Sequence, residues 1–392
     1  MSEFCRVKVK VSALLKHLPD DELENISKET KVDFQVKKLT GISMFRLMLY
    51  SMVNYQRSSL RVMEHFYNSL TFKTFADLGN VTTKFNSIQT RMTRINYLFF
   101  EKIFYILFDK FSDLLGEKSA ITRFDSTMVA ISSGLVSWGM KVGNKTNKKQ
   151  IKFTIGMKGS LPCHVEIFKT REALNENKTI PVAIFNYKQG TEEIVVFDRG
   201  PQDRKNYKKL SDNDRLFVTR IKTDVKYKKT IENKIAEKPK DATVTVINDY
   251  IVLLMDWDTN QWIETSFRLL IATMDKTDEP IYFLTNVEHL TAYEITFIYK
   301  QRWDIEVFFK FLKQELNLNH LVSRNENGIK VMIYMTLIVA ILLLAYKKLN
   351  KLKGYKLVKL QFANELEQEI FKEMVTICNE NPMIMKQLFN DS

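Results

Sequence analysis

The sequence predicts a mixed α/β fold, with an α-helical N-terminal domain, an α/β core that carries a β-rich insertion, and an α-helical C-terminal part. Apolar residues recur at helical intervals through the first 115 residues, and from Ile121 the apolar period changes to two. Long apolar helical segments return after residue 280. These changes divide the chain into an N-terminal domain (1–115), two parts of the core (116–226 and 281–350), the insertion between them (227–280) and a C-terminal region (351–392).

Composition agrees with a nucleic-acid partner. The 392 residues include 59 Lys and Arg against 46 Asp and Glu, and the net charge of +13 suits a surface that binds phosphates. With 45% hydrophobic residues, the chain can bury a large core. Cys5, Cys163 and Cys378 are widely spaced and form no CxxC pair, which argues against a disulfide framework or a zinc site and fits a reducing cytoplasm.

The N-terminal domain is expected to consist of helices. Segments 39–69 and 85–115 show apolar residues at helical intervals, and Asn80, Thr82 and Thr83 between them are candidates for helix breakers and caps. Several basic residues on the polar faces are either DNA contacts or ordinary solvated charges. They are Arg57, Arg61, Lys84, Arg91 and Arg94.

Two acidic residues lie where predicted strands bend or end. Asp125 is surrounded by β-branched and aromatic residues, and Asp198 follows a short apolar run and precedes a Gly-Pro turn. A carboxylate in a sheet needs a compensating positive charge, which a hard divalent cation held by oxygen ligands supplies. A predicted hairpin turns at Gly159 to Pro162. The order of three strands, a crossover and further strands is the one that a ribonuclease H-like core requires.

Two further groups of residues allow two interpretations each. Lys145, Lys148 and Lys149 lie in a lysine-rich segment after the first strand, where they either contact phosphates or belong to a solvated loop. The insertion alternates like a small antiparallel sheet docked onto the core, with a turn between Trp257 and Trp262. The structural interpretation of these tryptophans is a cross-strand aromatic pair.

A predicted helix over residues 298–316 carries the most informative pattern. Tyr299, Arg302, Glu306 and Lys313 are separated from the first of them by 3, 7 and 14 residues, so they share one helical face. An apolar stripe beside this face indicates a helix docked on a core, with its charges at the edge of a cleft. The alternative is that Arg302 and Glu306 form the i,i+4 pair of a solvated helix. The two upstream aspartates favour a magnesium site instead, because three carboxylates suit this ion.

One apolar segment raises the alternative of a membrane protein. It is uncharged for the 16 residues from Val331 to Tyr346, which is short of the ~20 that cross a bilayer. Lys347 and Lys348 at its end suit the C-terminus of a buried helix. We therefore expect a central helix of a globular domain and no membrane partner.

Three motifs together resemble the DDE transposases of the bacterial insertion-sequence-four family. Residues 299–313 fit the signature Tyr-x2-Arg-x3-Glu-x6-Lys at every position, Asp125 precedes Ser-Thr, and Asp198 begins an Asp-Arg-Gly motif. The resemblance extends from about Ile121 to Leu316. One departure is Pro201, which stands where an aromatic residue is common in the family.

The resemblance implies a catalytic site in which Asp125, Asp198 and Glu306 bind two Mg²⁺ ions, for which Mn²⁺ can substitute. Such a site cleaves a DNA phosphodiester by hydrolysis and then uses the free 3′-OH to join the element to target DNA. Arg302 and Lys313 would clamp flanking phosphates. Tyr299 would contact the DNA backbone through its hydroxyl, and Trp257 or Trp262 would stack on a flipped base.

The implied partners are double-stranded DNA, namely the terminal inverted repeats of the element and the target, and a second copy of the chain bound to that DNA. The helical segment from about Tyr355 to Leu388 is a candidate dimerisation surface. The implied location is the bacterial cytoplasm, at the nucleoid. The alternatives are a ribonuclease H-like DNA nuclease without strand transfer and a non-catalytic DNA-binding relative.

Overall fold

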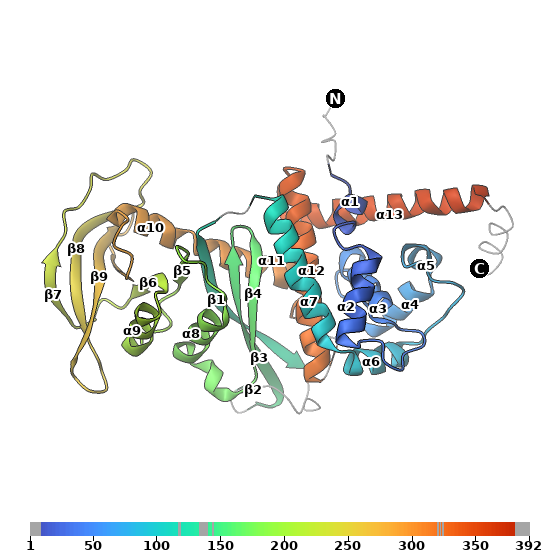
Figure 1. The fold of residues 1–392 in the computed structure, drawn as a ribbon, viewed down its shortest axis with the longest axis horizontal. Coiled ribbons are helices and arrows are strands. Elements are labelled where there is room, and N and C mark those ends of the chain that lie inside the picture. The colour runs from blue at the N-terminus through green and yellow to red at the C-terminus, as the bar shows by residue number, and fades with distance from the viewer. Residues whose placement is uncertain are drawn as a thin grey trace.

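The structure is a computed structural model that describes residues 9–116, 119–132, 140–142, 145–319, 321, 323 and 325–380. The side chains of residues 131–132, 140–142, 145–149, 171 and 379–380 are not part of the description. Figure 1 shows a helical part at one end of the molecule and a large sheet, flanked by helices, at the other. The mixed α/β class predicted from the sequence is confirmed.

Both ends of the chain build the helical part. Polar caps begin several of its helices, since Thr40 and Ser59 accept hydrogen bonds from the backbone N–H groups of Ser43 and Val62. The N-terminal helices are α1 (Val11–Leu15), α2 (Asp20–Thr30), α3 (Gly41–Asn54), α4 (Leu60–Asn68), α5 (Leu70–Phe75), α6 (Phe85–Arg94) and α7 (Tyr97–Leu114). They pack around two later helices, α12 (Glu326–Leu349) and α13 (Tyr355–Glu380).

Helix α12 is the central helix of this part. It is long and apolar enough to cross a membrane, yet 94% of its most apolar 18-residue stretch is buried inside the protein. It runs beside α7, between the sheet and the N-terminal helices (Figure 1). The prediction of a buried helix over Val331 to Tyr346 is therefore confirmed.

The sheet contains ten strands among the described residues. Their order is β2-β3-β1-β5-β6-β10-β9-β8-β7, and β4 pairs with β3. Strands β1, β5 and β6 are parallel, and the other pairs are antiparallel. The bounds are β1 (Ile121–Ser132), β2 (Met140–Val142), β3 (Lys145–Lys158), β4 (Leu161–Phe168), β5 (Ile194–Phe197), β6 (Leu216–Ile221), β7 (Tyr227–Glu232), β8 (Val244–Met255), β9 (Trp262–Met274) and β10 (Pro280–Thr285).

The strands of the insertion extend this sheet, which differs from the separate small sheet expected from the sequence. The reason is β10, which hydrogen-bonds to β6 on one side and to β9 on the other. A buried ion pair supports the junction, since Arg268 Nη2 lies 2.6 Å from Asp249 Oδ2. Arg268 also donates to the backbone carbonyl of Leu290, which precedes the next helix.

Helices cover both faces of the sheet. Helices α8 (Glu176–Asn186) and α9 (Arg204–Asp212) pack on one face against Phe124, Phe197 and Phe217. Helix α10 (Ala292–Lys300) packs on the other face against β5, β6 and β10, and α11 (Trp303–Gln314) packs there against β1 and β3. A short 3-10 helix (Arg171–Leu174) precedes α8.

The predicted helix over 298–316 is interrupted in the structure. Helix α10 ends at Lys300 and α11 begins at Trp303. The backbone tightens between them, because the N–H groups of Gln301 and Arg302 donate to carbonyls three residues earlier. Tyr299 and Glu306 therefore belong to two consecutive helices.

Candidate active site

Asp125 and Asp198 are neighbours across two parallel strands. Phe124 on β1 is in register with Phe197 on β5, and each aspartate is the next residue of its chain segment. Neighbouring strands lie about 4.8 Å apart, so the two carboxylates share one location although 72 residues separate them in the sequence. Both are half-buried.

The surroundings of Asp125 make its negative charge costly. The pKa of Asp125 is raised to about 6, chiefly by burial and also by the carboxylates of Asp198 and Glu176. The backbone N–H of Ser126, which donates to Asp125 Oδ1 at 2.7 Å, and the charge of Arg302 lower the pKa. The site thus concentrates negative charge that only partly finds compensation from the protein.

Tyr299 holds Asp198. Its hydroxyl donates to Asp198 Oδ1 at 2.9 Å, and its ring packs edge-on against Phe283 with 5.3 Å between the centroids. Burial raises the pKa of Tyr299, and the charge of Asp198 adds to the effect, so the hydroxyl stays protonated as a donor. The side chain is 8% exposed. In this structure the hydroxyl points to Asp198, whereas the sequence analysis assigned it to the DNA backbone.

Two cations complete the cluster. Arg302 Nη2 lies 2.6 Å from Glu306 Oε1, so the carboxylate that was expected to bind metal is engaged by arginine. Burial acts to lower the pKa of Arg302, but the neighbouring Tyr299, Asp198 and Glu306 raise it overall. Burial lowers the pKa of Lys313, while the nearby charge of Asp125 opposes this shift. Tyr299, Arg302 and Lys313 thus lie near the aspartate pair, and Glu306 is held by Arg302.

The comparison with known proteins places this site in a family. A family model described as "Transposase DDE domain" matches residues 117–342, more than half of the chain, and the match includes all three acidic residues. The chain belongs to this transposase DDE domain family. The matched region begins just before β1 and ends within α12.

Individual relatives agree with this assignment. A Synechocystis protein named as transposase for insertion sequence element IS4SA is 30% identical over 244 residues, which cover 60% of this chain and 62% of the relative. A Geobacillus stearothermophilus protein named as probable transposase for element IS5377 is 25% identical over 56% of the chain and 54% of the relative. The chain therefore spans less than two thirds of the length of these curated relatives.

One solved structure also resembles the chain loosely. It is the piggyBac transposase synaptic complex with hairpin DNA, which shares 11% identity over 99% of this chain and 86% of its own, at a TM-score of 0.48. This likeness is too loose to support a conclusion about fold or function.

The oxygen donors of the candidate DDE site, which is formed by Asp125, Asp198 and Glu306, fit a hard divalent ion. All three acidic residues offer carboxylate oxygens, the ligands that Mg²⁺ and Mn²⁺ take in proteins. Within the described ranges, no three acidic, histidine or cysteine side chains are close enough together to hold a metal ion. The third carboxylate, Glu306, is paired with Arg302 in this structure.

Glu176 is a further acidic residue near Asp125 that the sequence analysis did not find. It opens α8, pairs with Lys152 at 3.7 Å, and fills the space beside Gly200, where a Cβ would lie 1.5 Å from Glu176 Oε2. Lys152 is 3% exposed. The missing side chain of Gly200 thus leaves the space that the Glu176 carboxylate occupies. The sequence signalled only a helix start here, with Asn175 as the cap.

Of the other predicted DNA contacts, the structure describes the side chains of the two tryptophans. The side chains of Lys145, Lys148 and Lys149 lie outside the described part of the chain. Trp257 is 54% exposed near the β8–β9 turn, and the guanidinium of Arg204 lies 4.5 Å from its ring centroid. Trp262 begins β9 and is 41% exposed. Both indoles are therefore accessible to a partner.

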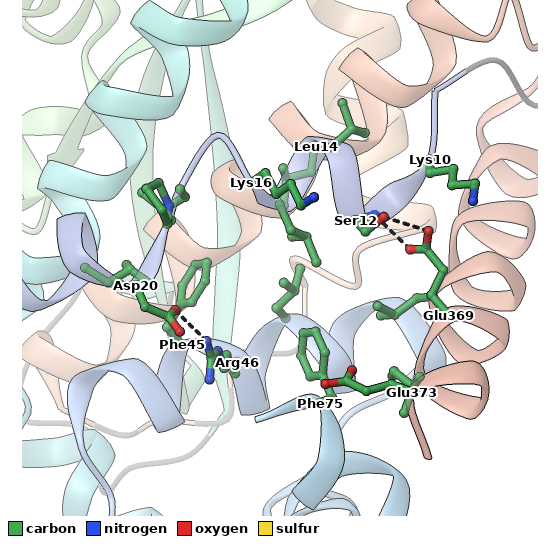
Figure 2. Close-up of a pocket in the computed structure, with 18 of the residues that line it drawn as sticks. Lys10, Ser12, Leu14, Lys16, Asp20, Phe45, Arg46, Phe75, Glu369 and Glu373 are labelled. Atoms are coloured by element: carbon green, nitrogen blue, oxygen red, sulfur yellow. Dashed lines mark hydrogen bonds and ion pairs between the residues drawn. The ribbon is translucent and has the colours of Figure 1, made fainter. Parts of the chain in front are cut away.

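A cavity in the helical part is separate from the DDE site. It measures about 560 Å³ and lies among α1, α2, α3 and α13. Figure 2 shows its polar rim, where Ser12 donates to Glu369 and Arg46 pairs with Asp20 at 2.5 Å. None of the described residues that line it belongs to the acidic cluster.

Proposed function

We propose that this chain is a DNA transposase of the insertion-sequence-four type. In this proposal it binds the ends of its element, cleaves the DNA with Asp125, Asp198 and Glu306, and joins the 3′-OH ends to target DNA. The observation that carries the proposal is the adjacent position of two aspartates on parallel strands, with Tyr299 and Arg302 in contact with the acidic residues. Membership of the transposase DDE domain family supports it.

We infer that the core is ribonuclease H-like. The strand order β4-β3-β1-β5-β6 supports this, because two antiparallel strands lie on one side of β1 and two parallel strands on the other. The domain bounds given above belong to the same proposal, with 1–115 gripping the terminal inverted repeats. The protein would act on DNA as a homodimer at the bacterial nucleoid.

We propose that the three carboxylates bind the metal ions. When bound, two Mg²⁺ ions supply Lewis acidity and a water nucleophile of lowered pKa for phosphodiester hydrolysis. Asp125 and Asp198 offer their oxygens from adjacent strand ends. Glu306 can join them once its carboxylate leaves Arg302, 2.6 Å away in this structure.

The remaining side chains orient the reactants. Tyr299 fixes the direction of the Asp198 carboxylate by donating to Oδ1. Arg302, once released from Glu306, is free to bind a DNA phosphate with its planar guanidinium. Lys313, close enough to Asp125 to influence its pKa, is placed to contact a phosphate beside the scissile bond.

The test uses three conservative substitutions, Asp125→Asn, Asp198→Asn and Glu306→Gln. The substrate is a plasmid that carries the DNA flanking the gene, and cleavage is measured with and without Mg²⁺. We expect each variant to lose Mg²⁺-dependent cleavage and to keep DNA affinity near that of the wild type. Wild-type cleavage by any of the three would overturn the assignment of that residue.

Strand transfer is tested separately with a precleaved end that carries a free 3′-OH. We expect joined products that require Mg²⁺ and all three carboxylates. Cleavage without joining would instead identify a ribonuclease H-like nuclease.

A further inference from the structure

A basic pocket lies beside the candidate active site, at the C-terminal end of α12. It measures about 600 Å³ and is bounded by the start of β1, the β3–β4 turn, the first turn of α11 and the segment that follows α12. Its charged lining residues are Arg123, Asp304, Lys347, Lys348, Lys351 and Lys353.

Among the described residues of this lining, the one carboxylate is paired with an arginine. Arg123 Nη1 lies 2.8 Å from Asp304 Oδ2, and Arg123 is 3% exposed, so a buried guanidinium compensates this carboxylate. Arg123 also donates to the carbonyl of Gly159 in the β3–β4 turn. The described lining therefore carries a net positive charge, to which Lys351 and Lys353 contribute.

Helix stabilisation explains only part of this charge. Lys347 and Lys348 occupy the last turn of α12, where cations interact favourably with the helix dipole. Lys351 and Lys353 follow the end of the helix and are exposed. Among the described residues, neither of them makes an ion pair. Two free cations at the rim of a concave, positive surface suit an anionic ligand.

The pocket adjoins the acidic cluster along β1. Arg123 precedes Asp125 by two residues on this strand, so both side chains lie on the same face of the sheet. Asp304 and Glu306, two residues apart on α11, lie on different sides of that helix. Two strand residues span about 7 Å. A phosphate bound at Arg123 would thus be close to one bound at the aspartates.

We propose that this pocket binds the phosphodiester backbone of the DNA strand that enters the active site. The inference rests on the proposed function for the identity of the anion. Flexible ammonium groups attract phosphates as point charges and do not read base edges, so the contact is independent of DNA sequence.

The first experiment measures the affinity of the full chain for a short duplex of arbitrary sequence, in EDTA, over a range of salt concentrations. The double variant Lys351→Ala/Lys353→Ala is compared with Lys234→Ala/Lys240→Ala, which removes the same charge from an exposed loop between β7 and β8. Each lost phosphate contact lowers the salt slope by about 0.9, so we expect a fall of about 1.8 in the pocket variant and no change in the control.

The second experiment locates the contact directly. Lysine acetylation is compared with and without the same duplex, and we expect DNA to protect Lys351 and Lys353 and to leave Lys234 and Lys240 reactive. An unchanged salt slope in the pocket variant, an equal fall in the control, or unprotected pocket lysines would overturn the proposal. Because no metal is present and no cleavage is scored, these outcomes are independent of the tests of the acidic residues.

Discussion

Replacing Tyr299 with Phe tests whether the signature tyrosine positions Asp198 or contacts DNA. The substitution removes one hydroxyl, which donates to Asp198 Oδ1 at 2.9 Å, and keeps the ring that packs on Phe283. A hydrogen bond to a charged group stabilises a protein by about 1.5–3 kcal/mol. Because Asp198 is half-buried and remains close to the charge of Arg302, we expect the low end, a loss of about 1.5 kcal/mol in unfolding free energy.

We also expect the loss of this hydrogen bond to lower the cleavage rate. Without its donor, the Asp198 carboxylate can rotate away from the orientation needed at the site. A cost of about 1.4 kcal/mol in the transition state corresponds to roughly a tenfold lower cleavage rate at saturating DNA. DNA affinity and its salt dependence should stay unchanged, because the hydroxyl faces Asp198 and the side chain is only 8% exposed.

Tyr346→Phe is the matched control. Its hydroxyl donates to Glu365 Oε2 at 2.6 Å in the helical part, so removing it should cost similar stability without changing cleavage. The positioning role is refuted if Tyr299→Phe lowers DNA affinity and its salt slope while bound DNA is cut at the wild-type rate. It is also refuted if both variants slow cleavage equally.

Other substitutions test the packing around the site. Gly200→Ala should lower the unfolding free energy by about 1–3 kcal/mol, and by less in a Glu176→Ala background, because the added Cβ displaces that glutamate. Arg268→Ala should cost about 3–5 kcal/mol in chemical unfolding, because it leaves the 1% exposed Asp249 unpaired. Burial acts to raise the pKa of Glu193, but four hydrogen-bond donors lower it overall. The unfolded state therefore binds the proton more tightly, so Glu193 stabilises the fold above about pH 4.3 and less as pH falls through its folded pKa. Unfolding of Glu193→Gln should consequently depend less steeply on acidic pH, and an unchanged pH profile would contradict the shift.

Local periodicity was sufficient for much of the fold. The apolar run from Val331 to Tyr346 predicted a buried helix because its uncharged length is too short for a bilayer and its end carries lysines. Period-two patterns likewise predicted the strand that holds Asp125 and the run that ends at Asp198. These features depend on neighbouring residues in the chain, so a sequence displays them.

Contacts between distant segments were not visible in the same way. Nothing near β10 indicates that it pairs with both β6 and β9, which makes one continuous sheet from the core and the insertion. Glu176 belongs to the site through its contacts with Gly200 and Lys152, and neither contact follows from spacing. The pairing of Arg302 with Glu306 was foreseen only as the solvated alternative, yet it occurs inside the site. The catalytic role of the acidic residues stays a prediction.

The central position of α12 constrains how the molecule forms during synthesis. The first seven helices leave the ribosome long before residues 326–349, yet α3, α6 and α7 pack directly against that helix. Until it arrives, their apolar faces lack a partner and are open to aggregation or chaperone binding. A copy of the gene truncated before residue 326 would therefore lose its N-terminal part as well, although every codon of that part is intact.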